Sequence, residues 1–290
     1  MTRPSHPAAL PAARGEGSSG SAPAPLRAVL RERRRCSPLP PPGGRGVGGE
    51  GRRLCVALLG IAALWASAAG AQVAIAPFST AAAGNAPPAG WSELAFPKIE
   101  RRTRYELVVD DGATVVAATA DASASGLIRR LDVPAASARV LRWRWKAIEL
   151  PAGSDTRVKA GDDAAARIYV TFRYESERLP WLFRVIYEAV RALYGELPPH
   201  AALMYVWDAR APSGASFPNP YTERVRTVVV ESGATRLNQW LAYERDVLAD
   251  YRAAFGEEPP PISGVAIMTD ADNTRGRAIA RYGDVTLSPR

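Results

Sequence analysis

The feature that most constrains the fold is the segment from Val140 to Ile148, in which apolar and basic residues alternate from Leu141 to Lys146. The apolar members occupy every second position: Leu141, Trp143 and Trp145. Side chains of an extended chain point alternately to two faces, so this segment predicts a strand with one face in the core and one in solvent. The segment from Arg167 to Tyr174 repeats the pattern, with Ile168, Val170 and Phe172 on the predicted inner face.

Further short apolar runs are separated by turn signals such as Asp110-Asp111-Gly112, which is typical of a β-rich chain. The remaining predicted strands are Tyr105–Val109, Thr114–Thr119, Leu127–Val133, Leu203–Asp208, Val225–Val230, Val265–Met268 and Asp284–Leu287. Many short strands of this kind predict a mainly β fold, an antiparallel β-sandwich of the jelly-roll type. One domain over residues 91–290 is the simplest organisation, with 72–90 as a linker or a loose first strand.

Two peripheral helices are expected on this sandwich. The first covers Trp181 to Tyr194, and its apolar side chains are expected to dock on the sandwich or to form a lid. The second extends from about Arg236 to Phe255, where apolar residues recur at helical spacing. Gly256 and the three prolines from Pro259 to Pro261 end it.

Residues 52–71 have the organisation of a cleavable signal peptide. Arg52 and Arg53 precede an apolar stretch from Leu54 to Trp65, and small residues up to Ala71 offer a cleavage site. The stretch is shorter than the roughly 20 residues of a membrane span, so an uncleaved anchor is the less favoured alternative. Residues 1–51 are rich in Pro, Gly and Arg, and we expect a disordered extension or a true start near Val47.

The positive charge of the chain is concentrated in this leader. Ten of its 37 basic residues and three of its 29 acidic residues precede Gln72, which leaves 27 bases and 26 acids in the remainder. A nearly neutral mature part argues against nucleic-acid binding, and membrane contact is expected only through the signal segment. We therefore predict a periplasmic or secreted protein, since the signal would direct export.

Cysteine and histidine exclude several kinds of site from the mature part. Both cysteines, Cys36 and Cys55, lie in the leader, so disulfides, thiolate zinc sites and cysteine nucleophiles are excluded after it. His200 is the only histidine after residue 71, which excludes a zinc site built from several imidazoles. No cofactor is expected from these residue types, apart from calcium as considered below.

Several motifs occur together in an order that resembles a known family. They are Ser123–Leu127, Leu141–Trp145, Gly161–Asp163 before Arg167–Val170, Tyr205–Trp207, Asn219–Thr222, Asp250–Gly256, and Asp270–Thr274 before Tyr282–Asp284. Together they resemble the bacterial domain of unknown function 3047, DUF3047, over Trp91 to Leu287. The resemblance implies an exported protein with a sandwich similar to galactose-binding-like modules, and it implies no particular activity.

The loop Asp270-Ala-Asp-Asn-Thr-Arg275 is a candidate calcium site. Asp270, Asp272 and Asn273 could supply the hard oxygen ligands that Ca²⁺ prefers. The loop lacks the closing glutamate of an EF-hand. The alternative is an Asx-turn, in which these side chains bond their own backbone.

A second candidate is the charged group around the start of the strand at Arg167. Lys159, Asp162, Asp163 and Arg167 could grip the hydroxyl groups of a sugar. Asp163 and Asp272 could instead act as the acid and base of a glycosidase, a reaction that uses two carboxylates. The alternative is surface salt bridging, because charged residues usually lie in solvent.

Aromatic side chains complete the set of candidate ligand-binding residues. Trp207, beside Asp208 and before a Gly/Pro-rich loop, is the tryptophan most expected to be exposed for stacking on a sugar, and Tyr221 could line a pocket. Trp143 and Trp145 fit a core better. The leading hypothesis is therefore binding of a carbohydrate or another small polar ligand; the alternatives are a carbohydrate-active enzyme and a structural or assembly protein of the cell envelope.

Overall fold

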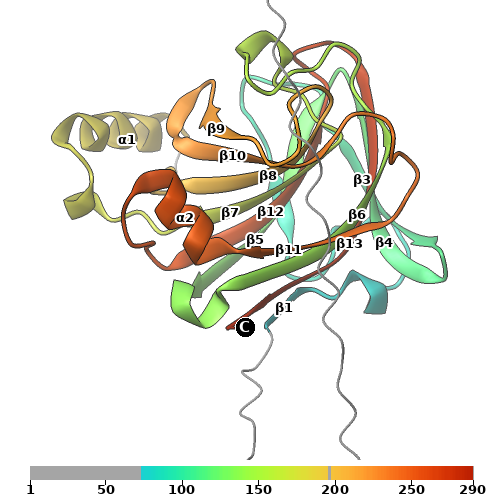
Figure 1. The fold of residues 1–290 in the computed structure, drawn as a ribbon, viewed down its shortest axis with the longest axis horizontal. Coiled ribbons are helices and arrows are strands. Elements are labelled where there is room, and N and C mark those ends of the chain that lie inside the picture. Colours follow the sequence, from blue (N-terminus) through green and yellow to red (C-terminus); the bar gives the residue numbers. More distant parts are fainter. Residues whose placement is uncertain (1–72, 195–196, 290) are drawn as a thin grey trace, which may run out of the picture. The chain divides into compact units, whose positions relative to one another are not determined.

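The computed structural model describes residues 73–194 and 197–289, which form two β-sheets packed face to face (Figure 1). The predictions made for residues 1–72, including the signal peptide and the start near Val47, lie outside the described residues. The mainly β sandwich predicted from the sequence is confirmed. Among the described residues, no helix is both long enough and apolar enough to cross a membrane.

The first sheet has six strands, all paired antiparallel. Its order is β11 (Leu241–Asp246), β6 (Val140–Glu149), β13 (Arg277–Ser288), β4 (Ala113–Asp121) and β3 (Arg104–Asp110), and β1 (Val73–Ala76) also pairs with β13. Because β1 lies in this sheet and Ile75 and Phe78 are buried, the segment predicted as a linker over 72–90 contributes to the packed domain.

The second sheet has seven strands and carries the candidate site. Its order is β2 (Ser92–Leu94), β5 (Ala124–Val133), β12 (Ile262–Asp270), β7 (Ala166–Phe172), β8 (Ala202–Asp208), β10 (Thr222–Ser232) and β9 (Ser216–Asn219). The purely antiparallel sandwich that we predicted needs one correction, because β8 and β10 are parallel. β9 follows β8 in the chain, and β10 then returns antiparallel to β9. β10 lies between β8 and β9 in the sheet and therefore runs in the same direction as β8.

The core lies between the two sheets and follows the predicted alternation. Trp143 and Trp145 of β6 point inward, and the ring of Trp143 lies 5.3 Å from that of Tyr205 on the opposite sheet. Ile168, Val170 and Phe172 of β7 are fully buried in the same core. The other face of β7 is therefore turned away from the first sheet, and this face carries Arg167 and Tyr169.

Two α-helices lie at the periphery, as predicted, but the second is much shorter than expected. α1 covers Trp181–Tyr194 and α2 covers Val247–Phe255. The predicted helical stretch from Arg236 to Asp246 is wrong: Asn238 has a left-handed backbone, and Leu241–Asp246 pairs with β6 as β11. Pairing with an open strand edge outweighs the helical spacing, and Asp246 then caps α2 by accepting from Ala249 N. Four 3₁₀ turns lie at Phe78–Thr80, Ala135–Ala138, Lys159–Gly161 and Ser176–Arg178.

Candidate functional site

A pocket of about 350 Å³ lies on the face of the second sheet that is turned away from the core. Alternate residues of β7 and β12 form its base, since their neighbours in the chain point into the sandwich. The lining residues come from six parts of the chain: Phe96, Ile99, Ala124, Asp162, Arg167, Tyr169, Asn219, Tyr221, Val225, Met268, Asp270, Asp272 and Asn273. Several residues predicted separately as binding or metal-ligating are thus brought into one cavity.

Arg167 organises the base of this pocket. Its Nη1 atom donates to Asp162 Oδ1 at 3.0 Å and its Nη2 atom to the Asp162 carbonyl at 2.7 Å. Its Nε atom lies 2.9 Å from Asp270 Oδ1 on the neighbouring strand. All three side chains are almost completely buried, so one guanidinium serves two carboxylates away from water. The alternative of surface salt bridging therefore does not hold for Arg167 and Asp162, which form a buried ion pair.

Asp163 fixes the loop that follows β12. Its carboxylate oxygens accept from the backbone N–H groups of Asn273 at 3.1 Å and Thr274 at 2.6 Å. The residue is fully buried, so these bonds compensate for the loss of hydration. Asp163 therefore positions the loop and turns no exposed oxygen toward a ligand.

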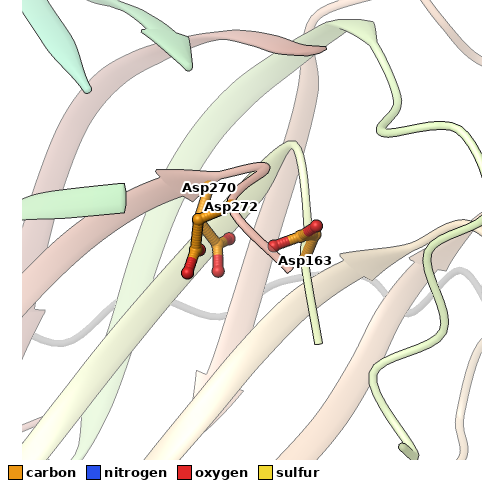
Figure 2. A group of neighbouring side chains, drawn as sticks. All are labelled: Asp163, Asp270 and Asp272. Atoms are coloured by element: carbon orange, nitrogen blue, oxygen red, sulfur yellow. The ribbon is translucent and has the colours of Figure 1, made fainter. Parts of the chain in front are cut away.

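Asp163, Asp270 and Asp272 form a group of carboxylates that face one another (Figure 2). One oxygen from each lies within 4.8 Å of the others, which is a geometry that could hold a metal ion. The trio overlaps the predicted calcium set of Asp270, Asp272 and Asn273. The Asn273 side-chain nitrogen instead donates to Lys159 O at 2.8 Å and to Tyr221 Oη at 2.9 Å.

Burial and mutual repulsion shape the electrostatics of the cluster. Burial raises the pKa of the Asp270 carboxyl well above its usual value, while the charge of Arg167 opposes this rise. Burial also raises the pKa of Asp272, and the negative charge of Asp163 adds to the effect. Asp272 is the partly exposed member of the trio, and its own backbone N–H donates to its carboxylate. It is therefore the carboxylate most available to a ligand.

Tyr221 stands at the edge of the pocket, as the sequence predicted, and is 56% exposed. Its hydroxyl group donates to Lys159 O at 3.2 Å, and the Lys159 ammonium lies 5.4 Å from the centre of its ring. Lys159 thus supports the site through its backbone carbonyl, while its side chain lies outside the lining. Tyr221 is an aromatic surface held in place by hydrogen bonds and left open to solvent.

Trp207 and Asp208 were predicted as ligand-binding residues, and the structure shows both to be structural. Trp207 is fully buried in the core, and its Nε1 atom donates to Gly233 O at 2.9 Å. Asp208 is also fully buried; its carboxylate accepts from Thr156 and from the backbone N–H groups of Arg210 and Ala211. The alternation of β8 sends Trp207 inward, and the polar neighbour that suggested exposure is a turn-forming residue.

Several residues of the pocket were not predicted from the sequence. Asn219, which begins the motif Asn219–Thr222, donates from its side chain to Asp162 Oδ2 at 3.1 Å. Tyr169 lies beside Arg167 on the same face of β7, two residues along, and burial raises its pKa to about 12. The alternation of β7 could have identified Tyr169. Phe96, Ile99 and Met268 come from distant segments, and only the fold assigns them to the pocket.

The apolar side chains of α1 were expected to dock on the sandwich or to form a lid, and most of them do not dock on the sandwich. Trp181, Leu182, Val185 and Ile186 are all exposed, whereas Tyr187 is buried and stacks on Tyr174 with ring centres 5.2 Å apart. The helix is thus attached through one side, and four of its large apolar side chains face solvent. The hypothesis of a structural or assembly role through this helix stays a prediction.

Comparison with solved structures finds several β-rich domains at low similarity. The family 11 carbohydrate-binding module of the cellulase Lic26A-Cel5E from Clostridium thermocellum has 7% identity and a TM-score of 0.38; the match covers 75% of this chain and 94% of the module. The xyloglucanase domain of NopAA from Sinorhizobium fredii, solved with cellobiose, has 8% identity and a TM-score of 0.34, with 70% and 99% covered. The K3 adhesin domain of Lys-gingipain from Porphyromonas gingivalis has 10% identity and a TM-score of 0.33, with 75% and 99% covered.

Sequence comparison gives a family but no curated relative. No curated protein matches this chain significantly. One family profile matches residues 89–286, which include every strand of the second sheet and the whole pocket lining. This match covers more than half of the chain and agrees with the resemblance found in its motifs. The chain therefore belongs to the family described as protein of unknown function, DUF3047.

Proposed function

We propose that this protein is an exported binding protein that holds a carbohydrate, or another small polar ligand, in the pocket of the second sheet. One observation carries the proposal: the exposed ring of Tyr221 stands at the edge of a pocket whose base is a buried network of Arg167 and two carboxylates. Sugars present apolar C–H faces and polar hydroxyl edges, which match an aromatic surface beside fixed polar groups.

The pocket is preorganised for binding. Asp162 is held by Arg167 and Asn219, and the loop after β12 is held by Asp163. Side chains locked by such contacts lose little conformational freedom when a ligand arrives, so more of the interaction free energy appears as affinity. The volume of about 350 Å³ lies at the lower end of the roughly 300–1,000 Å³ of small-molecule sites. This size favours one or two sugar units in the pocket.

Binding is favoured over glycoside hydrolysis by the state of the carboxylates. The predicted acid and base, Asp163 and Asp272, do lie close together, with oxygens within 4.8 Å. A hydrolase needs both carboxyl groups to reach the scissile bond. Asp163 is fully buried, is not among the pocket-lining residues and accepts backbone N–H groups of the loop, so it does not face a ligand in the pocket.

The location outside the cytoplasm is part of the proposal and rests on the composition of residues 52–71. Fractionation of a native host, with detection by an antibody against the 91–290 region, tests it. Recovery from the periplasm or medium, with a mature N-terminus near Gln72, is expected. Recovery of the intact chain from the cytosol would contradict export and leave the pocket unaffected.

The binding proposal is tested by isothermal titration of the protein with oligosaccharides from bacterial envelopes and plant cell walls. We expect saturable binding for at least one class and a loss of affinity of about twofold to tenfold in Tyr221→Ala, because an aromatic stacking contact contributes about 0.5–1.5 kcal/mol. Tyr174→Ala, which alters an aromatic residue beside α1, is the matched control and should bind normally. No heat with any ligand of a broad panel would reject the proposal.

A further inference from the structure

We propose that the pocket selects ligands that carry a positively charged group, and that an amino sugar unit with a free amine is the preferred class. This inference rests on the proposed function and names the chemistry of its ligand. Three carboxylates line the pocket, from Asp162, Asp270 and Asp272, against a single guanidinium from Arg167. Asp163 adds a further negative charge directly behind the lining.

The charge of Arg167 is already divided between two partners. It pairs with Asp162 at 3.0 Å and with Asp270 at 2.9 Å, and it acts on Asp272 through its charge without forming an ion pair with it. Asp163 is compensated by the backbone N–H groups of Asn273 and Thr274. Asp272 is left as the partly exposed carboxylate with no cationic side chain paired to it. A cation entering the pocket would therefore pair with Asp272, a carboxylate to which no cationic side chain of the described residues is paired.

The walls of the pocket also suit an organic cation. Phe96, Tyr169 and Tyr221 contribute aromatic rings, and Met268 contributes a polarizable sulfur. Aromatic faces attract ammonium groups and cover the apolar C–H groups of a ring. The Lys159 ammonium already lies 5.4 Å from the ring centre of Tyr221, although Lys159 is not part of the lining. An anionic sugar would instead face the carboxylates of Asp162, Asp270 and Asp272.

A bare divalent ion fits this cluster less well than an ammonium group. Calcium takes six to eight oxygen ligands, whereas the carboxylate group described here consists of Asp163, Asp270 and Asp272. The Asp270 oxygen Oδ1 accepts from Ala164 N and lies beside the guanidinium of Arg167, which would repel a divalent ion. An ammonium group needs only a few hydrogen-bond acceptors. The carboxylate of Asp272 can supply one, and hydroxyl groups of the ligand can supply the others.

The experiment compares three β-1,4-linked tetrasaccharides that differ at one ring position: the glucosamine, N-acetylglucosamine and glucose tetramers. Titration of the full-length protein in a mildly acidic, low-salt buffer should give the glucosamine tetramer an affinity about tenfold or more above that of the other two. The preference should shrink as salt is added, because screening weakens charge attraction. Asp272→Asn should abolish the preference, so that the glucosamine tetramer no longer binds more tightly than the glucose tetramer. Asp132→Asn, an exposed acid outside the pocket, is the matched control and should keep it.

The outcomes separate this inference from the proposed function. Equal affinity for the three tetramers would reject the charge preference and keep carbohydrate binding. Binding of none, together with the broad panel, would reject both. Calcium chloride alone is titrated as a further probe: saturable calcium binding that Asp272→Asn removes would overturn the inference in favour of a metal site.

Discussion

Arg167 Nε lies 2.9 Å from Asp270 Oδ1, and the two side chains are 2% and 3% exposed. They occupy neighbouring antiparallel strands, β7 and β12, so the pairing of the sheet itself sets their distance. Such a buried pair contributes little net stability when intact, because desolvation offsets attraction, but breaking it leaves an uncompensated charge. Because this pair forms the base of the pocket, a change at the pocket base should also change the stability of the second sheet.

Replacing Arg167 should therefore be strongly destabilising. Arg167→Met leaves Asp162 and Asp270 buried without their cation, and we expect the free energy of unfolding to fall by about 3–5 kcal/mol in urea denaturation. Arg173→Met is the matched control: Arg173 pairs with Asp132 at the surface, half exposed, and its loss should cost about 0–1 kcal/mol. Equal effects of the two changes would contradict the role given to Arg167.

Asp163 should control the mobility of the loop after β12. Asp163→Ala removes the acceptors of Asn273 N and Thr274 N, and hydrogen bonds to a charged group contribute about 1.5–3 kcal/mol each. Hydrogen exchange at these two amides should become faster in the variant, while exchange in the strands of the first sheet changes little. Asp163→Asn keeps one acceptor oxygen and should give an intermediate result. Unchanged protection of both amides would show that the loop is held by other contacts.

Asp272 should make stability depend on pH in an unusual direction. Its folded-state pKa is raised, so the folded protein binds more protons than the unfolded chain between the usual aspartate value of 3.8 and the raised value. The contribution of Asp272 to the free energy of unfolding is fully present below this pH interval and is lost as the pH rises through it. Asp272→Asn should raise Tm at neutral pH and have little effect at the acid end. A lower Tm for the variant at neutral pH would show that the carboxylate is stabilising.

Substitution of Trp207 should mainly affect stability, whereas substitution of Tyr221 should mainly affect ligand binding. Trp207→Ala removes a fully buried side chain and should lower the free energy of unfolding by about 3–5 kcal/mol. Tyr221→Ala removes a half-exposed ring and should change stability far less while weakening ligand affinity. The two are measured by chemical denaturation and by titration with the best ligand. A Trp207 variant that is as stable as the native protein but unable to bind would restore the original sequence prediction.

The sequence by itself determined the fold class, most strands and the faces of the central ones. Alternation is a local property with period two, so Trp143, Trp145 and the inner face of β7 could be assigned from neighbours in the chain. The sequence also predicted the helix α1 with its observed bounds. It failed for residues 236–246, because the apolar spacing around Leu241 suits either a helix or an edge strand, and only pairing with β6 selects the strand.

Only the tertiary structure decided which polar residues form a site. Asp163 and Thr274 are 111 positions apart, and Asn219 and Asp162 are 57 apart, yet each pair is joined by a hydrogen bond. The sequence predicted most of the acidic pocket residues and Tyr221 as site residues. It wrongly predicted Trp207 and Asp208 as ligand-binding, and it did not predict Tyr169 and Asn219. Contacts between distant segments depend on how whole strands are ordered in a sheet, and no local pattern of side chains encodes that order.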